Sequence, residues 1–179
     1  MIVEVSLFQK LVLYLGSPTI SLSILLSSLL VGMGTGSYFG RNMYGTDARK
    51  RLQVVSMAIV VVGILLFVVS PFLLAKSLEF ALPLRAATTF LVILPLAFLL
   101  GIPFPSCLQL LALDHKDRFI PWMYGVNGSM SVLGSVLAVI LSMLFGFTPA
   151  YFGGLAFYAG VLPIAFVSSK KARLSAVAA

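Results

Sequence analysis

Charged residues are scarce in this chain, and the side chains that build most metal centres are almost missing. Lysine, arginine, aspartate and glutamate make up 9% of its 179 residues, whereas soluble domains carry about 25%. The single cysteine, Cys107, excludes a disulfide within the chain and a cysteine-rich metal site. The single histidine, His115, excludes a multi-histidine metal site in one chain. We therefore expect no bound metal ion.

The chain instead contains four long runs without any charged residue. They are Leu11–Gly40, Leu52–Ala75, Ala86–Leu113 and Phe119–Ser169. One helical crossing of a bilayer needs about 20 apolar residues, so the last run is too long for a single crossing. Lipid offers no partner for backbone groups, and the period-two alternation of a membrane β-barrel is absent. The sequence therefore predicts an all-α, polytopic membrane helix bundle that forms one domain.

Glycine and proline divide these runs into about six segments, because they mark the ends and first turns of helices. Breaks at Gly16–Pro18 and Gly146–Pro149 separate the first two and the last two segments. The predicted segments are residues 2–15, 19–40, 52–75, 86–112, 119–145 and 150–168. The first is too short to cross a bilayer comfortably, so it is predicted to be truncated. Its shortness suggests a fragment whose upstream residues belong to another polypeptide.

The positive residues predict an orientation. Of the twelve lysines and arginines, nine lie in the loop Arg41–Arg51, in the turn Asp114–Arg118 or after Ser169. Only Lys76 and Arg85 fall in the loop that six crossings would place on the other side. By the positive-inside rule the C-terminus is predicted to be cytoplasmic. The net charge of +7 is thus better explained by contact with anionic lipid than by nucleic acid.

Small residues recur at helical spacing in two segments. Gly32, Gly36 and Gly40 are four residues apart, which would let a neighbouring helix approach closely. They predict tight helix packing or, as the alternative, a sliding surface between moving helices. A second small-residue face, in the fifth segment, also predicts packing; it comprises Gly128, Ser131, Gly134 and Ser135.

Polar residues inside the first segment are candidates for ligand binding. Glu4, Gln9 and Lys10 form the most polar cluster in any segment. An ionisable group at membrane depth is costly and marks a functional site by default. Because the segment is short and a lysine stem can extend to the headgroups, solvation at the membrane edge is the alternative.

Two further places are candidate ligand contacts. Pro103 and Pro105 follow Gly101 within the fourth segment, and proline removes a backbone donor and clashes with the preceding turn. The resulting break either lines a cavity at the membrane midplane or serves packing alone. Asn127 lies inside the fifth segment, where it either bonds to another helix or contacts a ligand.

The order and spacing of these motifs resemble the membrane portion of spermidine synthase-like integral membrane proteins. The matching stretches cover most of the chain: Glu4, Gln9, Lys10, Leu15–Pro18, Leu29–Ser37, Gly101–Pro105 and Pro121–Ser135. Ser17 stands where family members commonly have histidine. The resemblance implies the C-terminal six-helix part of those proteins, in a bacterial or archaeal cytoplasmic membrane. The helix pattern is also similar to half of a major facilitator-type transporter.

Many proteins of that family also carry a soluble aminopropyltransferase domain, and this chain lacks its signatures. No strand-associated glycine loop is present, and Asp114 and Asp117 belong to a short charged turn. We expect no catalytic residue, no cofactor and no catalysis by this chain alone. The expected role is anchoring or small-molecule binding, with a partner chain that supplies a synthase domain or further helices. The alternative is a half-transporter that works as a homo-oligomer.

Overall fold

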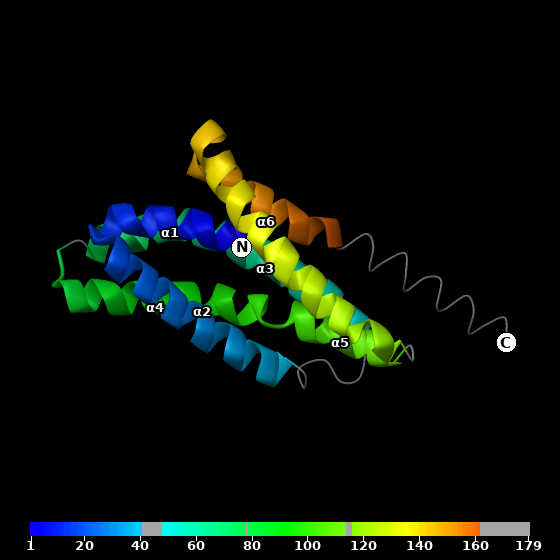
Figure 1. Cartoon of the computed structure of the whole chain (residues 1–179). Coiled ribbons are helices and arrows are strands. Elements are labelled where there is room, and N and C mark those ends of the chain that lie inside the picture. Colours follow the sequence, from blue (N-terminus) through cyan, green and yellow to red (C-terminus); the bar gives the residue numbers. More distant parts are fainter. Residues whose placement is uncertain (41–47, 78, 114–115, 162–179) are drawn as a thin grey trace.

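The computed structural model describes residues 1–40, 48–77, 79–113 and 116–161, and these are helical except at short connections (Figure 1). The described residues contain no strand, which confirms the all-α fold class. The helices are α1 (Ile2–Leu15), α2 (Pro18–Gly40), α3 (Ala48–Ser77), α4 (Leu82–Leu100), α5 (Pro103–Leu113) and α6 (Ile120–Phe145). A short 3-10 helix, η1 (Asp117–Phe119), precedes α6, and residues 147–161 form a further helix.

Four stretches are long and apolar enough to cross a membrane. They are Pro18–Gly40, Ala48–Leu73, Leu82–Leu113 and Ile120–Phe145. Helix α1 has 14 residues, which gives a length of about 21 Å at 1.5 Å per residue and falls short of a bilayer core. The chain is therefore an integral membrane protein with several crossing helices and a short first helix.

Four helices begin earlier than the sequence predicted, one of them, α2, by a single residue, at Pro18 instead of residue 19. Helix α3 starts at Ala48 instead of residue 52, α4 at Leu82 instead of residue 86, and the last helix at residue 147 instead of 150. At α3 and α4 charge marks the edge of the hydrocarbon, but arginine and lysine are good helix formers and continue a helix beyond that edge. The last helix instead holds Pro149 in its first turn, where proline is tolerated. The predicted loop residues 41–47, the turn residues 114–115 and residues 162–179, with the C-terminus, lie outside the described residues.

Helices α2 and α4 share the most extensive contact in the bundle. The glycines of α2 allow this approach. A Cβ atom added to Gly32 would lie 2.4 Å from the Cβ of Ala97, and one added to Gly36 would lie 1.9 Å from the carbonyl oxygen of Phe98. At Gly40 the nearest atom would be in the Ile102 side chain, at 2.6 Å. The glycines at four-residue spacing thus form the face on which α2 meets α4 and the residues that follow it.

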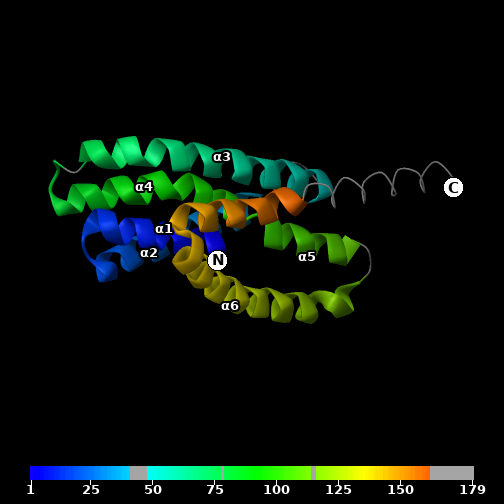
Figure 2. The ribbon, with the colours of Figure 1, turned by 90° about the horizontal axis from the view of Figure 1, so that it is seen from above.

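Helix 147–161 packs against α1 and α3 through two more glycines. A Cβ at Gly63 would lie 2.6 Å from Leu155, and a Cβ at Gly154 would lie 2.6 Å from Val3. Gly146 precedes this helix with a φ of 88°, a conformation that suits glycine and ends α6. Figure 2 shows the chain reversing at this point, so that helix 147–161 runs back alongside α1.

Helix α6 stands apart from the rest of the bundle. It contacts α1, and near its beginning it contacts η1 and α5. Of the four crossing stretches it has the smallest buried share, 11% against 28% to 33% for the others. Figure 1 shows it running away from α5 after its first turns.

Candidate functional site

The continuous fourth segment of the sequence is broken into α4 and α5 at Gly101 and Ile102. Pro103 occupies the first position of α5, and Pro105 follows in the same turn, so neither contributes a backbone donor. Gly101 keeps a right-handed φ of −74°, so turn geometry does not demand a glycine here. Close approach does, because an added Cβ would lie 2.3 Å from the carbonyl oxygen of Met33 on α2.

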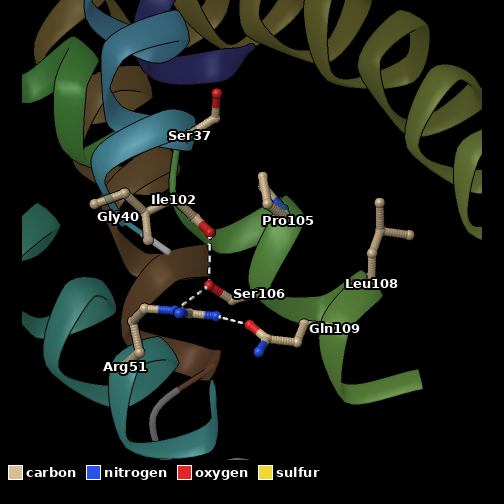
Figure 3. Close-up of a pocket in the computed structure, with 8 residues that line it drawn as sticks. All are labelled: Ser37, Gly40, Arg51, Ile102, Pro105, Ser106, Leu108 and Gln109. Carbon is tan, nitrogen blue, oxygen red and sulfur yellow. Dashed lines mark hydrogen bonds between the residues drawn. The ribbon is translucent and has the colours of Figure 1, made fainter. Parts of the chain in front are cut away.

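A pocket of about 310 Å³ lies beside this break, where the end of α2, the first turns of α3 and the beginning of α5 meet. Figure 3 shows the residues that line it. They are Ser37, Gly40, Arg51, Ile102, Pro105, Ser106, Leu108 and Gln109. The volume is at the small end of the range for ligand sites, about 300 to 1,000 Å³. The pocket suits a small polar molecule or a headgroup.

Arg51 is the dominant side chain of the pocket. It is 2% exposed and extends from α3 across to α5. Its Nε donates to the Ser106 hydroxyl at 3.0 Å, and its Nη2 donates to Oε1 of Gln109. Ser106 in turn donates to the carbonyl oxygen of Ile102 at 2.8 Å. These bonds hold the planar guanidinium in one orientation at the pocket wall.

The pocket lies near one end of the crossing helices. Arg51 is the last charged residue before the uncharged run of α3, and Gly40 is the last residue of α2. Pro105 lines this space and Pro103 opens the helix beside it, where α2 ends and α5 begins. The cavity at the membrane midplane, one of the two alternatives for this break, stays a prediction.

The candidates on α1 do not converge on this pocket. The carboxylate of Glu4 is largely buried and forms an ion pair with the N-terminal amino group of Met1, at 3.0 Å. The ammonium of Lys10 lies 3.8 Å from the centroid of the Phe67 ring and 5.9 Å from that of Tyr151. Such cation–π contacts stabilise the ammonium of Lys10, which is half-buried. Oε1 of Gln9 is buried and has no hydrogen-bond partner among the residues that the structure describes.

Of the other predicted ligand contacts, only Pro105 lines the pocket. Pro103 starts α5, half-buried, and acts by breaking the helix. Asn127 is exposed on α6, and neither a bond to another helix nor a ligand contact is seen for its side chain among the described residues. Its carbonyl oxygen accepts the hydroxyl of Ser131 within the same helix.

The second small-residue face packs only in part. Gly128 is exposed, and a Cβ added there would meet no atom within 4 Å. Gly134 faces Met1, with 3.3 Å between its added Cβ and the Cβ of Met1. Ser131 and Ser135 are half-buried and bond to carbonyl oxygens of their own helix. This face of α6 meets no other helix of the described chain at Gly128 because α6 diverges from the bundle.

Sequence reasoning missed the central residues of the pocket: Arg51, Ser37, Ser106 and Gln109. Arg51 was assigned to a basic loop, and the structure shows that it is a buried helical residue. One signal was available, since Gln109 is the only amide side chain between Ala86 and Leu113. A lone amide in an apolar run requires a polar partner, but the sequence does not say which one.

Within the described ranges, no three His, Cys, Asp or Glu side chains lie close enough together to hold a metal ion. Comparison with protein-family models, curated proteins and solved structures found no match for this chain.

Proposed function

We propose that the chain is a multi-pass membrane module that binds a small polar molecule or headgroup in the pocket beside Arg51. In this proposal it corresponds to the transmembrane part of a spermidine synthase-like protein, without the aminopropyltransferase domain, and works with a partner chain. The observation that carries the proposal is the pocket itself. A buried guanidinium, two serines and an amide side chain gather around a space of about 310 Å³ at the end of the crossing helices.

The sparse packing of α6 supports the partner chain. Membrane helices associate through small residues and interhelical hydrogen bonds. Asn127 and Gly128 offer both on an exposed face of α6. A second copy of this chain, or a chain with further helices, would complete that face.

A substitution that fills the pocket tests the binding proposal. Ser37 lines the pocket and is half-buried, so Ser37→Trp should occupy the space and abolish ligand-induced stabilisation. The measurement is thermal unfolding of the purified protein in maltoside micelles with spermidine, glycerol or glycerol 3-phosphate. Ser27→Trp is the matched control, because Ser27 is exposed on the same helix. If no compound raises the unfolding temperature, or if both variants respond alike, the binding proposal fails.

The orientation belongs to the same proposal, with the membrane being the cytoplasmic membrane of a bacterium or archaeon. In this proposal the C-terminus is cytoplasmic, which the excess of positive residues on one side supports through the positive-inside rule. We expect a fluorescent protein fused after Ala179 to fluoresce and a periplasmic phosphatase fused there to stay inactive. The opposite pattern would reverse the orientation and place the pocket on the outer side.

The alternative function is a half-transporter of the major facilitator type that acts as an oligomer. The break between α4 and α5 favours it, because discontinuous helices recur at transporter binding sites. Uptake of the pocket ligand by proteoliposomes distinguishes the two, since a binding module gives none above protein-free vesicles. A polyamine suits neither version well, because Arg51, the one charged side chain among the described residues that line the pocket, is cationic.

A further inference from the structure

We infer that a helix of a partner chain docks on the first half of α6, in line with α1, and forms a hydrogen bond with Asn127 inside the membrane. This inference rests on the proposed function, whose partner chain it describes: an uncharged, apolar helix with small residues and one hydrogen-bonding side chain. The juxtaposition that carries it is an exposed amide on the same face of α6 that α1 covers two turns later.

The face of α6 that packs on α1 continues beyond the reach of α1. Gly134 faces the first residues of α1, and Ala138 and Ser142, four and eight residues later, are buried. Asn127 is exposed and lies seven residues before Gly134, which is two helical turns earlier on the same face. Figure 1 marks the N-terminus of the chain beside the middle of α6. Within the described residues, this face is therefore covered over the second half of α6 and open over the first.

The open length of α6 matches the length that α1 lacks. Helix α1 has 14 residues and is about 21 Å long, about 9 Å less than a hydrocarbon core of about 30 Å. The seven residues from Asn127 to Gly134 span about 10 Å along α6. A helical segment of about two turns, placed in line with α1, would therefore complete the crossing and cover Asn127 at the same time.

Asn127 lies within the hydrocarbon. The 26 residues of α6 span about 39 Å, so a centred helix extends about 5 Å beyond a core of about 30 Å at each end. Asn127 comes seven residues after Ile120, about 10 Å along the helix, and so lies about 5 Å inside the core. Lipid tails offer an amide no hydrogen bond at that depth.

The side chain of Asn127 needs a hydrogen-bond partner. The backbone carbonyl oxygen of Asn127 accepts the Ser131 hydroxyl at 2.8 Å, which satisfies the main chain. For the side-chain amide, which can both donate and accept, no hydrogen bond is found among the described residues. Membrane helices associate through interhelical bonds of such amides. A serine, threonine, asparagine or glutamine at this depth of a partner helix would supply the bond.

The neighbours of Asn127 select a helix with small residues and no charge. A Cβ added to Gly128 would meet no atom of the described chain within 4 Å, so another helix can approach this glycine closely. Tyr124, one turn before Gly128, bounds the open stretch through its edge contact with the Phe104 ring of α5, at a centroid distance of 5.2 Å. Residues 119–145 hold no charged side chain, so α6 offers a charged partner helix no counter-ion.

The first turn of α1 favours placement in line with that helix. No side chain caps the beginning of α1, and the first N–H groups of any helix lack an intrahelical partner. The C-terminal end of a partner helix presents carbonyl oxygens and the negative end of the helix dipole. Such an end complements the donors of α1, which the side of a continuous crossing helix would not do.

The test measures binding of a synthetic helix to the full chain in maltoside micelles. The probe is a leucine–alanine peptide as long as α1, with two lysines at its N-terminus, an amidated C-terminus and one asparagine seven residues before that end. A matched peptide has leucine in place of the asparagine. Trp122 is the only tryptophan of the chain and is exposed, so energy transfer from Trp122 to a dansyl group on the peptide's N-terminus reports docking beside the first half of α6. We expect the asparagine peptide to bind about fivefold more tightly, the value of one interhelical hydrogen bond.

Three variants locate the contact, all at exposed positions that leave the packed core unchanged. Asn127→Leu should remove the preference for the asparagine peptide, because the amide of the chain is gone. Gly128→Leu should abolish binding of both peptides, because its side chain holds the second helix away. Ser129→Leu is the matched control, since Ser129 lies on the opposite side of the same turn, and it should bind both peptides as the unmodified chain does.

The inference is overturned if the two peptides bind equally or not at all, or if Asn127→Leu keeps the preference. Two other occupants would also overturn it. A dimer that forms without peptide, and that Gly128→Leu dissociates in sedimentation, would assign the face to a second copy of this chain. Docking only when the peptide is fused ahead of Met1 would assign it to a segment of the same polypeptide.

The pocket provides the separation from the proposed function. Ligand-induced stabilisation that Ser37→Trp abolishes would preserve the binding proposal even where no peptide docks. Peptide docking without any ligand effect would preserve the partner helix and remove the pocket's role.

Discussion

Gly36→Ala should be among the most damaging single-methyl changes in this protein. The added Cβ would lie 1.9 Å from the carbonyl oxygen of Phe98 and 2.8 Å from its carbonyl carbon. Both are backbone atoms of α4, so no side chain can rotate away and α2 must move outward. Overpacking of this kind costs about 3 kcal/mol. We expect that loss in the free energy of unfolding, measured by titration with dodecyl sulfate in mixed micelles.

Gly34→Ala is the matched control, because it lies on the same helix two residues earlier. A Cβ at Gly34 would meet no atom within 4 Å. Alanine also has a higher helix propensity than glycine, by about 1 kcal/mol in a helix interior. The control should therefore leave the stability unchanged or raise it slightly. Equal losses from both variants would show that the Gly32, Gly36 and Gly40 face is not what joins α2 to α4.

Gly36 and Gly34 also show which packing contacts could be predicted from the sequence and which could not. A spacing of four predicts one helix face, and Gly32, Gly36 and Gly40 do lie on one face against α4. Gly34 is offset from that face, and a Cβ added to it would meet no atom of the described chain within 4 Å. The identity of the partner could not be predicted, since every run in this chain is apolar. Lipid tails are as apolar as leucine, so hydropathy does not distinguish a helix-facing from a lipid-facing surface.

The pocket was harder to predict than the fold for a related reason. Ser106 bonds to its own helix at Ile102, as Ser6 does to Ile2 and Ser21 does to Ser17. Such local bonds are the ordinary way in which a serine is accommodated in lipid. Only the contact from Arg51 distinguishes Ser106, and that contact joins residues 55 positions apart. A contact between residues so far apart in the chain cannot be predicted from a single sequence.

The break at Gly101–Pro105 was predicted in part. Two prolines near a glycine predicted that the helix would stop and restart, and α4 and α5 do so. The position of the break along the bundle depends on where α2 ends and α3 begins beside it. The charged residues predicted the start of α3 four residues too late, about one turn of helix. The structure places a pocket beside this break, near the last residue of α2 and the first turns of α3.

Tyr151→Ala should detach helix 147–161 from α3. Tyr151 is fully buried, and its hydroxyl donates to the carbonyl oxygen of Gly63 at 2.9 Å. Its ring stacks on the ring of Phe67 at a centroid distance of 5.6 Å. The Phe67 ring also makes a cation–π contact with the ammonium of Lys10. Removing the ring leaves a cavity between three helices and should cost about 3 kcal/mol. Unfolding in mixed micelles measures the loss.

Two further variants divide that loss into its causes. Tyr151→Phe keeps the ring and removes only the hydroxyl, so it should cost about 1 kcal/mol, the value of one interhelical hydrogen bond in a membrane. Phe157→Ala removes an aromatic ring from the same helix at a position that is 68% exposed, and should cost less than about 0.5 kcal/mol. If Phe157→Ala were as damaging as Tyr151→Ala, the docking of this helix would not depend on its buried face. The loss in the free energy of unfolding should therefore be largest for Tyr151→Ala, smaller for Tyr151→Phe and smallest for Phe157→Ala. This order is expected because close packing, more than apolarity, stabilises helix association in a bilayer.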